Sequence, residues 1–247
     1  MPTAIVSLED RAGRKHTVDQ AERLKLLSEV DVLEPLATEE IDWLSQRTPE
    51  RSFKRGDMVY AAGDASEVLL LLLTGRIRLY EIAAGQEFTF EVIQAGTMFG
   101  EASLAGRTHP EYAQALEPAR VGLLNLSTFW QLVRENPEVN ARVLKLVVTR
   151  SYMNRSRMTD IALKAVQARL ASLILELLQG EGVVTSEGHY RIAAPYTHEQ
   201  LATMIGAKRA AVTRAFGKLQ DIGCVELLRR QVYVTDLALL SRLAIEA

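Results

Sequence analysis

The pattern of apolar and polar positions divides this chain of 247 residues into stretches of different character. Residues 1–18 are polar and lack periodicity, which predicts a loosely held tail. From about residue 50 to 130, glycines separate short apolar segments such as Val68–Leu73, Arg76–Ile82 and Phe88–Ile93, which predict strands. Strands that follow one another about every 10 residues, with no helical pattern between them, predict a β-sandwich or jelly roll.

Helical patterns precede this β-rich region. Leu24, Leu27 and Val30 recur every three residues and predict a short helix. A second helix is predicted to begin with Thr38 as its N-cap, because acidic residues in the following first turn favour the positive end of a helix.

Beyond Pro137 the pattern is helical for more than 20 residues, and it has two apolar faces. A single apolar face would be explained by packing on the chain's own jelly roll, whereas two faces favour a helix that also meets a second copy. We therefore predict a homodimer and assign the first stripe to its interface. That stripe comprises Val139, Val143, Leu146, Arg150 and Met153. The second stripe comprises Leu144, Val148, Met158 and Ile161.

The segment from Thr197 to Leu219 predicts two short helices joined by a turn. Thr197 is a good N-cap with Gln200 at the capping-box position, and Gly206 stops the first helix. The second helix begins by Arg209. Its inner face is apolar and its outer face basic, as a helix-turn-helix that enters the major groove requires. The alternative is an ordinary helical hairpin with a solvated basic face.

Two short strands around a basic turn follow, from Cys224 to Val234, and predict a β-wing whose Arg229 and Arg230 reach phosphates. Residues 195–235 contain six basic and three acidic residues, so this segment has a net charge of +3 in a chain whose net charge is −2. The cations therefore gather where the motif predicts double-stranded DNA. A signalling module whose winged helix binds a protein is the competing interpretation.

The composition narrows the classes of protein to which the chain can belong. A length of 247 residues and an apolar fraction of 48% suit one large or two small globular domains. One cysteine excludes an internal disulfide and a cysteine-ligated iron–sulfur cluster, and the four histidines lack metal-ligand spacing. No apolar run could span a bilayer, and the N-terminus is no secretory signal. We expect a cytoplasmic protein that is not an enzyme, with no membrane partner, metal or cofactor.

The order of these parts resembles the CRP/FNR family of bacterial transcription regulators over residues 20–240. The specific motifs are Met98-Phe99-Gly100-Glu101 and the segment from Gly206 to Arg214. The resemblance implies an α+β protein with a jelly-roll effector domain (19–135), a dimerisation helix (136–163) and a winged helix-turn-helix (164–247), after the tail (1–18). It also implies a homodimer on a two-fold-related operator, recruitment of RNA polymerase, and activation as the default.

The resemblance assigns base reading to Arg209 and Arg214. The acidic reader that the family usually has between them is Ala210 here, and Lys208 stands where the family usually has a serine or threonine cap. We expect looser readout at one base pair, since alanine cannot accept a hydrogen bond from cytosine. The residues expected to contact the DNA backbone or support the readers are Thr197, Lys208, Ala210, Thr213, Lys218, Arg229 and Arg230.

The effector site departs from the family's cAMP cassette. Gly100 and Glu101 match the ribose-binding pair, but Glu111 and Tyr112 stand where the phosphate-binding arginine and its serine or threonine belong. Asn154 and Arg155 replace the adenine-contacting pair on the long helix. A carboxylate repels a phosphate, so we expect independence from cAMP. The alternatives are a phosphate contact from Arg107, another small ligand, haem bound by His109 and Pro2, and oxidation of Cys224.

Overall fold

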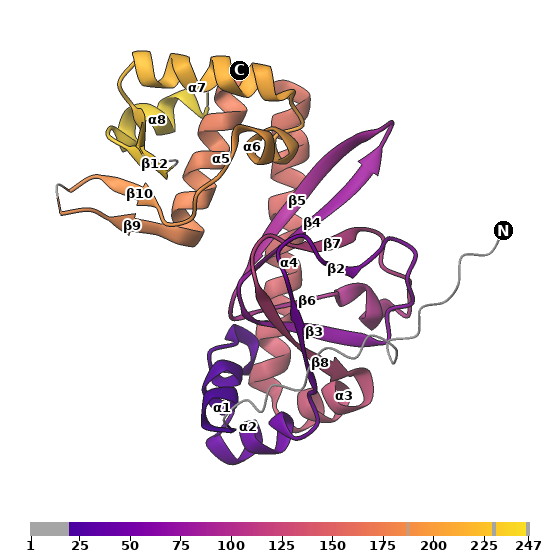
Figure 1. The fold of residues 1–247 in the computed structure, drawn as a ribbon. Helices are drawn as coiled ribbons and strands as arrows, with labels where there is room; N and C mark the ends of the chain where they lie inside the picture. The colour runs from indigo at the N-terminus through magenta and orange to yellow at the C-terminus, as the bar shows by residue number, and fades with distance from the viewer. Residues whose placement is uncertain (1–19, 187, 229–230, 246–247) are drawn as a thin grey trace. The chain divides into compact units, whose positions relative to one another are not determined.

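The computed structural model describes residues 20–186, 188–228 and 231–245 (Figure 1). The predicted tail over residues 1–18 and the two arginines of the predicted wing turn, Arg229 and Arg230, lie outside these ranges. The chain divides into two compact units, and each is described by itself. The first comprises residues up to 81 together with 90–150, and the second comprises 82–89 together with the residues from 151 onward.

Two four-stranded antiparallel sheets form the body of the first unit (Figure 1). Their strand orders are β1-β8-β3-β6 and β2-β7-β4-β5, which confirms the predicted jelly roll. The strands are β1 (Glu50–Phe53), β2 (Met58–Tyr60), β3 (Val68–Thr74), β4 (Arg76–Ala83), β5 (Gln86–Gln94), β6 (Thr97–Phe99), β7 (Tyr112–Ala115) and β8 (Ala119–Asn125).

The turn between β3 and β4 depends on Gly75. Its φ is +84°, a left-handed conformation that disfavours side chains. A Cβ at this position would also lie 2.5 Å from the carbonyl oxygen of Pro118. Glycine is therefore required here both by the backbone conformation and by the close approach of a second segment.

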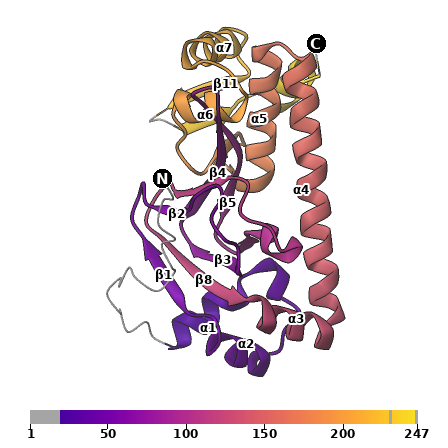
Figure 2. The same ribbon diagram turned by 90° about the vertical axis from the view of Figure 1, so that its right-hand side faces the viewer.

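Short helices cover one end of the first unit's sheets (Figures 1 and 2). Ala37, and not Thr38 as predicted, is the N-cap of α2. Its N–H donates to the carboxylate of Glu40 at 2.8 Å, so an acidic side chain of the first turn satisfies the helix end. The helical elements are α1 (Gln20–Ser28), η1 (Asp31–Leu33), α2 (Thr38–Ser45), η2 (Glu101–Ala105) and α3 (Leu126–Glu135).

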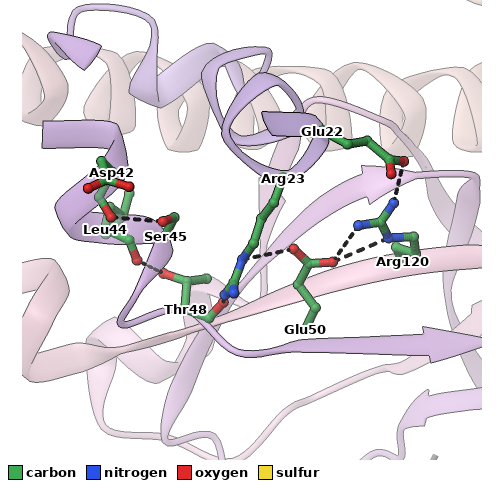
Figure 3. A network of polar contacts seen from close by, with 8 residues as sticks. All are labelled: Glu22, Arg23, Asp42, Leu44, Ser45, Thr48, Glu50 and Arg120. Carbon is green, nitrogen blue, oxygen red and sulfur yellow. Dashed lines mark hydrogen bonds and ion pairs between the residues drawn. The ribbon is translucent and has the colours of Figure 1, made fainter. Parts of the chain in front are cut away.

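Ion pairs attach α1 to the neighbouring strands β1 and β8 (Figure 3). Glu50 of β1 accepts from Arg120 at 2.8 Å and pairs with Arg23 at 3.1 Å. Arg120 also donates to Glu22 of α1 at 2.8 Å, and Arg23 donates to the carbonyl of Thr48. This network joins segments far apart in the sequence and fixes α1 on the jelly roll.

The long helix α4 (Pro137–Leu163) is continuous (Figure 2), but it uses its two apolar faces differently from the prediction. Val139 and Val143 are buried in the apolar core of the first unit, and Leu146 packs against that core. Arg150 is 7% exposed and forms ion pairs within the unit. The assignment to a dimer interface is therefore wrong for Val139, Val143 and Arg150, since their own unit already buries them; Met153 remains 39% exposed.

The second stripe of α4 is exposed instead. Leu144, Val148 and Met158 are 62%, 58% and 71% exposed. The first stripe, which the sequence assigned to a partner, thus packs mainly inside the chain, and the second stripe remains available to a partner.

The second unit contains a helix-turn-helix and a four-stranded sheet of order β11-β12-β10-β9 (Figure 1). Gly182 caps α5, as predicted, whereas Gly180 lies within the helix. The elements are α5 (Val166–Glu181), β9 (Gly182–Val184), β10 (Tyr190–Ile192), α6 (His198–Met204), α7 (Arg209–Asp221), β11 (Val225–Leu228), β12 (Gln231–Val234) and α8 (Leu237–Leu243). Of the helices in the described ranges, none is long and apolar enough to cross a membrane.

Candidate nucleic-acid interface

A reciprocal capping box begins α6, as the sequence predicts. The hydroxyl of Thr197 accepts from the N–H of Gln200 at 3.1 Å, and the side-chain oxygen of Gln200 accepts from the N–H of Thr197 at 2.9 Å. Two of the N–H groups at the helix start are therefore satisfied, which fixes where α6 begins.

The turn between α6 and α7 is held by local bonds and by α5. Gly206 has a φ of +61°, the left-handed conformation expected just past a helix end. The N–H of Ala207 donates to the carbonyl of Ala202 at 3.0 Å. Arg169 of α5 donates to the carbonyl of Ile205 at 2.8 Å. This contact secures the turn to the rest of the second unit.

The helix α7 has one buried and one basic face. Val212, Phe216 and Leu219 are at most 1% exposed, whereas Arg209, Arg214 and the other outward residues are exposed. No residue in the described ranges forms an ion pair with the four cations of this outer face, so their charge is available to a partner. These cations are Lys208, Arg209, Arg214 and Lys218.

Lys208 is the N-cap of α7 and makes no side-chain capping bond, in agreement with the prediction. Ala210 and Thr213 are also exposed on the outer side. The expected readers and their neighbours thus occupy one helix, from its first turn onward, and residues 209 and 213, like 210 and 214, lie one turn apart.

A contact between the two helices is not predicted by the sequence, in which His198 is one of four scattered histidines. The Nδ1 atom of His198 lies 2.9 Å from the hydroxyl oxygen of Thr213. That hydroxyl lies 3.1 Å from the carbonyl of Arg209, to which it donates. The imidazole also stacks on Phe216, with ring centroids 5.4 Å apart. Only the crossing of α6 and α7 brings these groups together, so no local signal reveals them.

The predicted wing strands are present as an antiparallel pair. Val225 lies opposite Val234, and Leu228 opposite Gln231. Cys224, just before the pair, is fully buried and donates to the carbonyl of Leu219 at 3.3 Å. Burial raises the pKa of the Cys224 thiol, which disfavours the reactive thiolate.

In the first unit, Glu101 of the cassette is engaged by the chain itself. Gly100 adopts a left-handed φ of +78° and leads into η2. The guanidinium of Arg150 donates to both carboxylate oxygens of Glu101, at 3.0 and 3.1 Å, and pairs with Glu91 at 3.0 Å. Burial opposes this charge, but the two carboxylates outweigh it, so the pKa of Arg150 is raised.

Glu111, at the position expected for a phosphate-binding arginine, is also partnered internally. The hydroxyl of Tyr60 donates to Glu111 at 2.7 Å, and the Tyr60 ring stacks on His109 with centroids 3.6 Å apart. Burial raises the pKa of Glu111, and the charge of Glu101 adds to this shift. Burial likewise lowers the pKa of His109. Burial therefore disfavours the charged forms of both Glu111 and His109.

The remaining effector-site residues make other contacts. Arg107 lines a cavity of about 310 Å³ together with Ser66 and Ser103, and neither Glu101 nor Glu111 belongs to its lining. Tyr112 stacks on Tyr80 at 5.3 Å. Asn154 and Arg155 are exposed on α4, and the Arg155 guanidinium lies 5.0 Å from the ring centre of Tyr152.

Comparison with known proteins agrees with this architecture. Residues 50–136 match the cyclic nucleotide-binding domain, and residues 168–243 match the Crp-like helix-turn-helix domain. The FixK2 structure from Bradyrhizobium japonicum is 20% identical with a TM-score of 0.72, covering 81% of this chain and 98% of that one. A CooA mutant from Carboxydothermus hydrogenoformans is 19% identical with a TM-score of 0.75, covering 87% and 94%.

Similar curated proteins are regulators rather than enzymes. The Thermus thermophilus "Cyclic AMP receptor protein" is 28% identical over 212 residues, which span 85% of this chain and 94% of that protein. A "CRP-like cAMP-activated global transcriptional regulator" of Mycobacterium tuberculosis is 24% identical over 225 residues, or 89% and 99%. The fold, the basic helix and these matches define a DNA-binding transcription regulator. The chain belongs to the CRP/FNR family.

Proposed function

We propose that the protein acts in the cytoplasm as a homodimer that recognises a palindromic promoter site, activates transcription there with RNA polymerase, and does so without cAMP. The observation that carries the proposal is the outer face of α7. Its cations are exposed and have no partner in the described ranges, while the opposite face is fully buried in the second unit. A rigidly seated helix with such a face suits the major groove.

Arg209 and Arg214 are the proposed base readers. An arginine donates two hydrogen bonds to O6 and N7 of guanine, so each reader favours a guanine. Ala210 offers no acceptor to cytosine, which relaxes one position of the half-site. Lys208 and Lys218 carry charge to the phosphates without reading sequence. Thr197 and Thr213 support the same face. Arg229 and Arg230 lie outside the described ranges, and their contact with phosphates stays a prediction from the sequence.

The exposed stripe of α4 supports the homodimer. Leu144, Val148, Ser151, Arg155 and Met158 recur at spacings of four, three, four and three residues, which is the seam of a two-stranded coiled coil. All five are exposed in the single chain. Pairing two copies along this seam would cover large apolar side chains that are otherwise solvated and would present two copies of α7 to a two-fold operator.

Two features support independence from cAMP, although the names of two similar proteins refer to cAMP. Glu111 places a carboxylate where the resemblance expects a phosphate-binding arginine, and a phosphate there would meet repulsion. Glu101, the expected ribose ligand, already accepts both of its close hydrogen bonds from Arg150. The chain's own Arg150 thus occupies the carboxylate of Glu101 that a nucleotide ribose would need as its hydrogen-bond partner.

The test begins with duplexes selected by the wild-type protein from a random library without nucleotide. Fluorescence anisotropy then compares the selected duplex with a scrambled one. We expect Arg209→Ala and Arg214→Ala to lose about 1–3 kcal/mol on the selected duplex and to relax base preference. Lys218→Ala is the matched control, since it should weaken binding to both duplexes and lower the salt slope by about 1. Equal losses on both duplexes for the arginine variants would refute the base-reading role.

The same titration addresses the effector. Added cAMP should leave the affinity unchanged, and a large gain in selective binding with cAMP would overturn this part of the proposal. Transcription in vitro with RNA polymerase and the selected site upstream of a promoter tests activation. A transcript level that falls when the protein is added would identify a repressor instead.

A further inference from the structure

We propose that His198 and Thr213 form a positioning pair that sets how α7 presents Arg209 and Arg214 to base edges. The inference rests on the proposed DNA-reading function of α7. His198 is the first residue of α6, and Thr213 lies on α7 between the two readers, one turn after Arg209. The pair therefore links α6, the supporting helix, to α7, the helix that is proposed to contact DNA.

The direction of the hydrogen bonds follows from the groups present. Thr213 has one hydroxyl hydrogen and two oxygen lone pairs. Its hydrogen is donated to the carbonyl of Arg209 at 3.1 Å, the usual bond of a helical threonine to the residue four before it. With the hydroxyl hydrogen used in this way, we assign a hydrogen to Nδ1 of His198, which lies 2.9 Å from the same oxygen and donates to it in this tautomer. The result is a chain from α6 through Thr213 to the backbone of the first reader.

The other ring nitrogen shows that the imidazole acts within the protein. Nε2 of His198 is shielded from solvent and has no hydrogen-bond partner in the described ranges. The ring face packs on the buried Phe216. An imidazole held in this way is not placed to bind a phosphate, so its contribution to DNA binding passes through Thr213.

The pair also restricts what Thr213 can offer to DNA. Its hydrogen is used by Arg209, and one lone pair is used by His198. If the pair positions the readers, removing either side chain's polar group breaks the same connection. Loss of both groups should then cost no more selectivity than loss of one, because effects of groups that act as a unit are not additive.

Four variants separate the hydrogen bond from the packing. His198→Phe keeps a ring against Phe216 and removes the donor, whereas His198→Asn places an amide nitrogen near the Nδ1 position without the ring. Thr213→Val keeps the shape and removes the hydroxyl, whereas Thr213→Ser keeps the hydroxyl. The readouts are the ratio of affinities for the selected and scrambled duplexes, and the thermal midpoint of each variant.

We expect His198→Phe and Thr213→Val each to lower the affinity ratio about 3- to 10-fold, a size typical of coupled neighbours, with no further loss in the double variant. His198→Asn and Thr213→Ser should keep the ratio within about 2-fold of wild type. A merely structural role would lower the thermal midpoint and weaken both duplexes equally, which would overturn the proposal. So would additive losses in the double variant, which would mean that the Thr213 hydroxyl reads a base itself. A wild-type protein that does not distinguish the duplexes would instead refute the proposed function, and the inference with it.

Discussion

Replacing Arg150 by methionine removes the guanidinium that Glu91 and Glu101 share while keeping a long side chain in the same space. Arg150 is 7% exposed, and its two ion pairs join α4 to β5 and to the cassette helix η2. The variant leaves two carboxylates without their counter-charge. We therefore expect it to destabilise the first unit and to leave the fold of the second unit unchanged.

The size of the effect follows from burial. Removing one partner of a fully buried ion pair costs about 3–5 kcal/mol, chiefly because the other charge remains unpaired. The side chains of Glu91 and Glu101 are each 31% exposed, so water compensates part of this loss. We expect a decrease of about 2–3 kcal/mol in the free energy of unfolding. With a slope of about 1.5 kcal/mol per molar urea, the midpoint should fall by roughly 1.3–2 M.

Tryptophan fluorescence can measure this unit alone. The chain has two tryptophans, Trp43 on α2 and Trp130 on α3, and both belong to the first unit. Urea unfolding is followed at fixed protein concentration, since association would otherwise shift the midpoint. Lys145→Met is the matched control, because Lys145 is an exposed cation of the same helix.

Two results would refute the reasoning. One is an unchanged urea midpoint for Arg150→Met, and the other is an equal decrease for Lys145→Met. The variant Arg150→Met combined with Glu101→Gln supplies a further check. Since it removes one of the stranded charges, it should recover part of the lost stability; a further decrease would mean that the ion pair to Glu101 is not the source of the effect.

Three further predictions follow from the structure. Leu144→Asp places a charge on the exposed seam of α4 and should convert the homodimer to monomer in sedimentation, whereas Lys145→Met should not; an unchanged dimer would reject the seam. Glu111→Gln removes a carboxyl whose pKa burial raises, so the folded state binds its proton more tightly than the unfolded state. The stability that wild type gains from this proton is present below the usual pKa of a glutamate and is lost as pH rises through the folded-state pKa. In urea titrations the variant should therefore be more stable than wild type at pH 8, and this difference should vanish toward pH 4.5. A difference in stability that does not change with pH would contradict this prediction. Gly75→Ala should cost more than about 2 kcal/mol through strain and the contact with Pro118, whereas Gly56→Ala, with an equally positive φ but open space, should cost about 1 kcal/mol; similar midpoints for both would contradict the packing argument.

The parts of the site that sequence could predict depend on local chemistry. Thr197 and Gln200 are close in sequence, and their capping box follows from their spacing alone. Gly206 marks the end of α6 because a left-handed residue is needed there. The two faces of α7 follow from the helical period. Such features require no knowledge of the rest of the chain.

Other features depend on contacts between distant segments. Two apolar faces can be recognised on α4, but only the core that Val139 and Val143 share with residues of α1, β3 and α3 decides that these two turn inward. Arg150 reads as a polar position on an apolar stripe until Glu91 and Glu101 approach it from elsewhere in the chain. The bond between His198 and Thr213 likewise exists only once α6 and α7 cross.

The distribution of buried residues along α4 has a consequence for its order. Its buried residues are Val139, Val143 and Arg150, and no residue from 151 to 163 is buried. An ion pair between Arg157 and Glu176 of α5 holds this second half, but it contributes little apolar burial. In the proposed homodimer, helix order there is coupled to association by mass action. Amide hydrogen exchange in residues 151–163 should therefore slow more with rising total protein concentration than exchange in 139–150, where packing within the first unit already protects the helix.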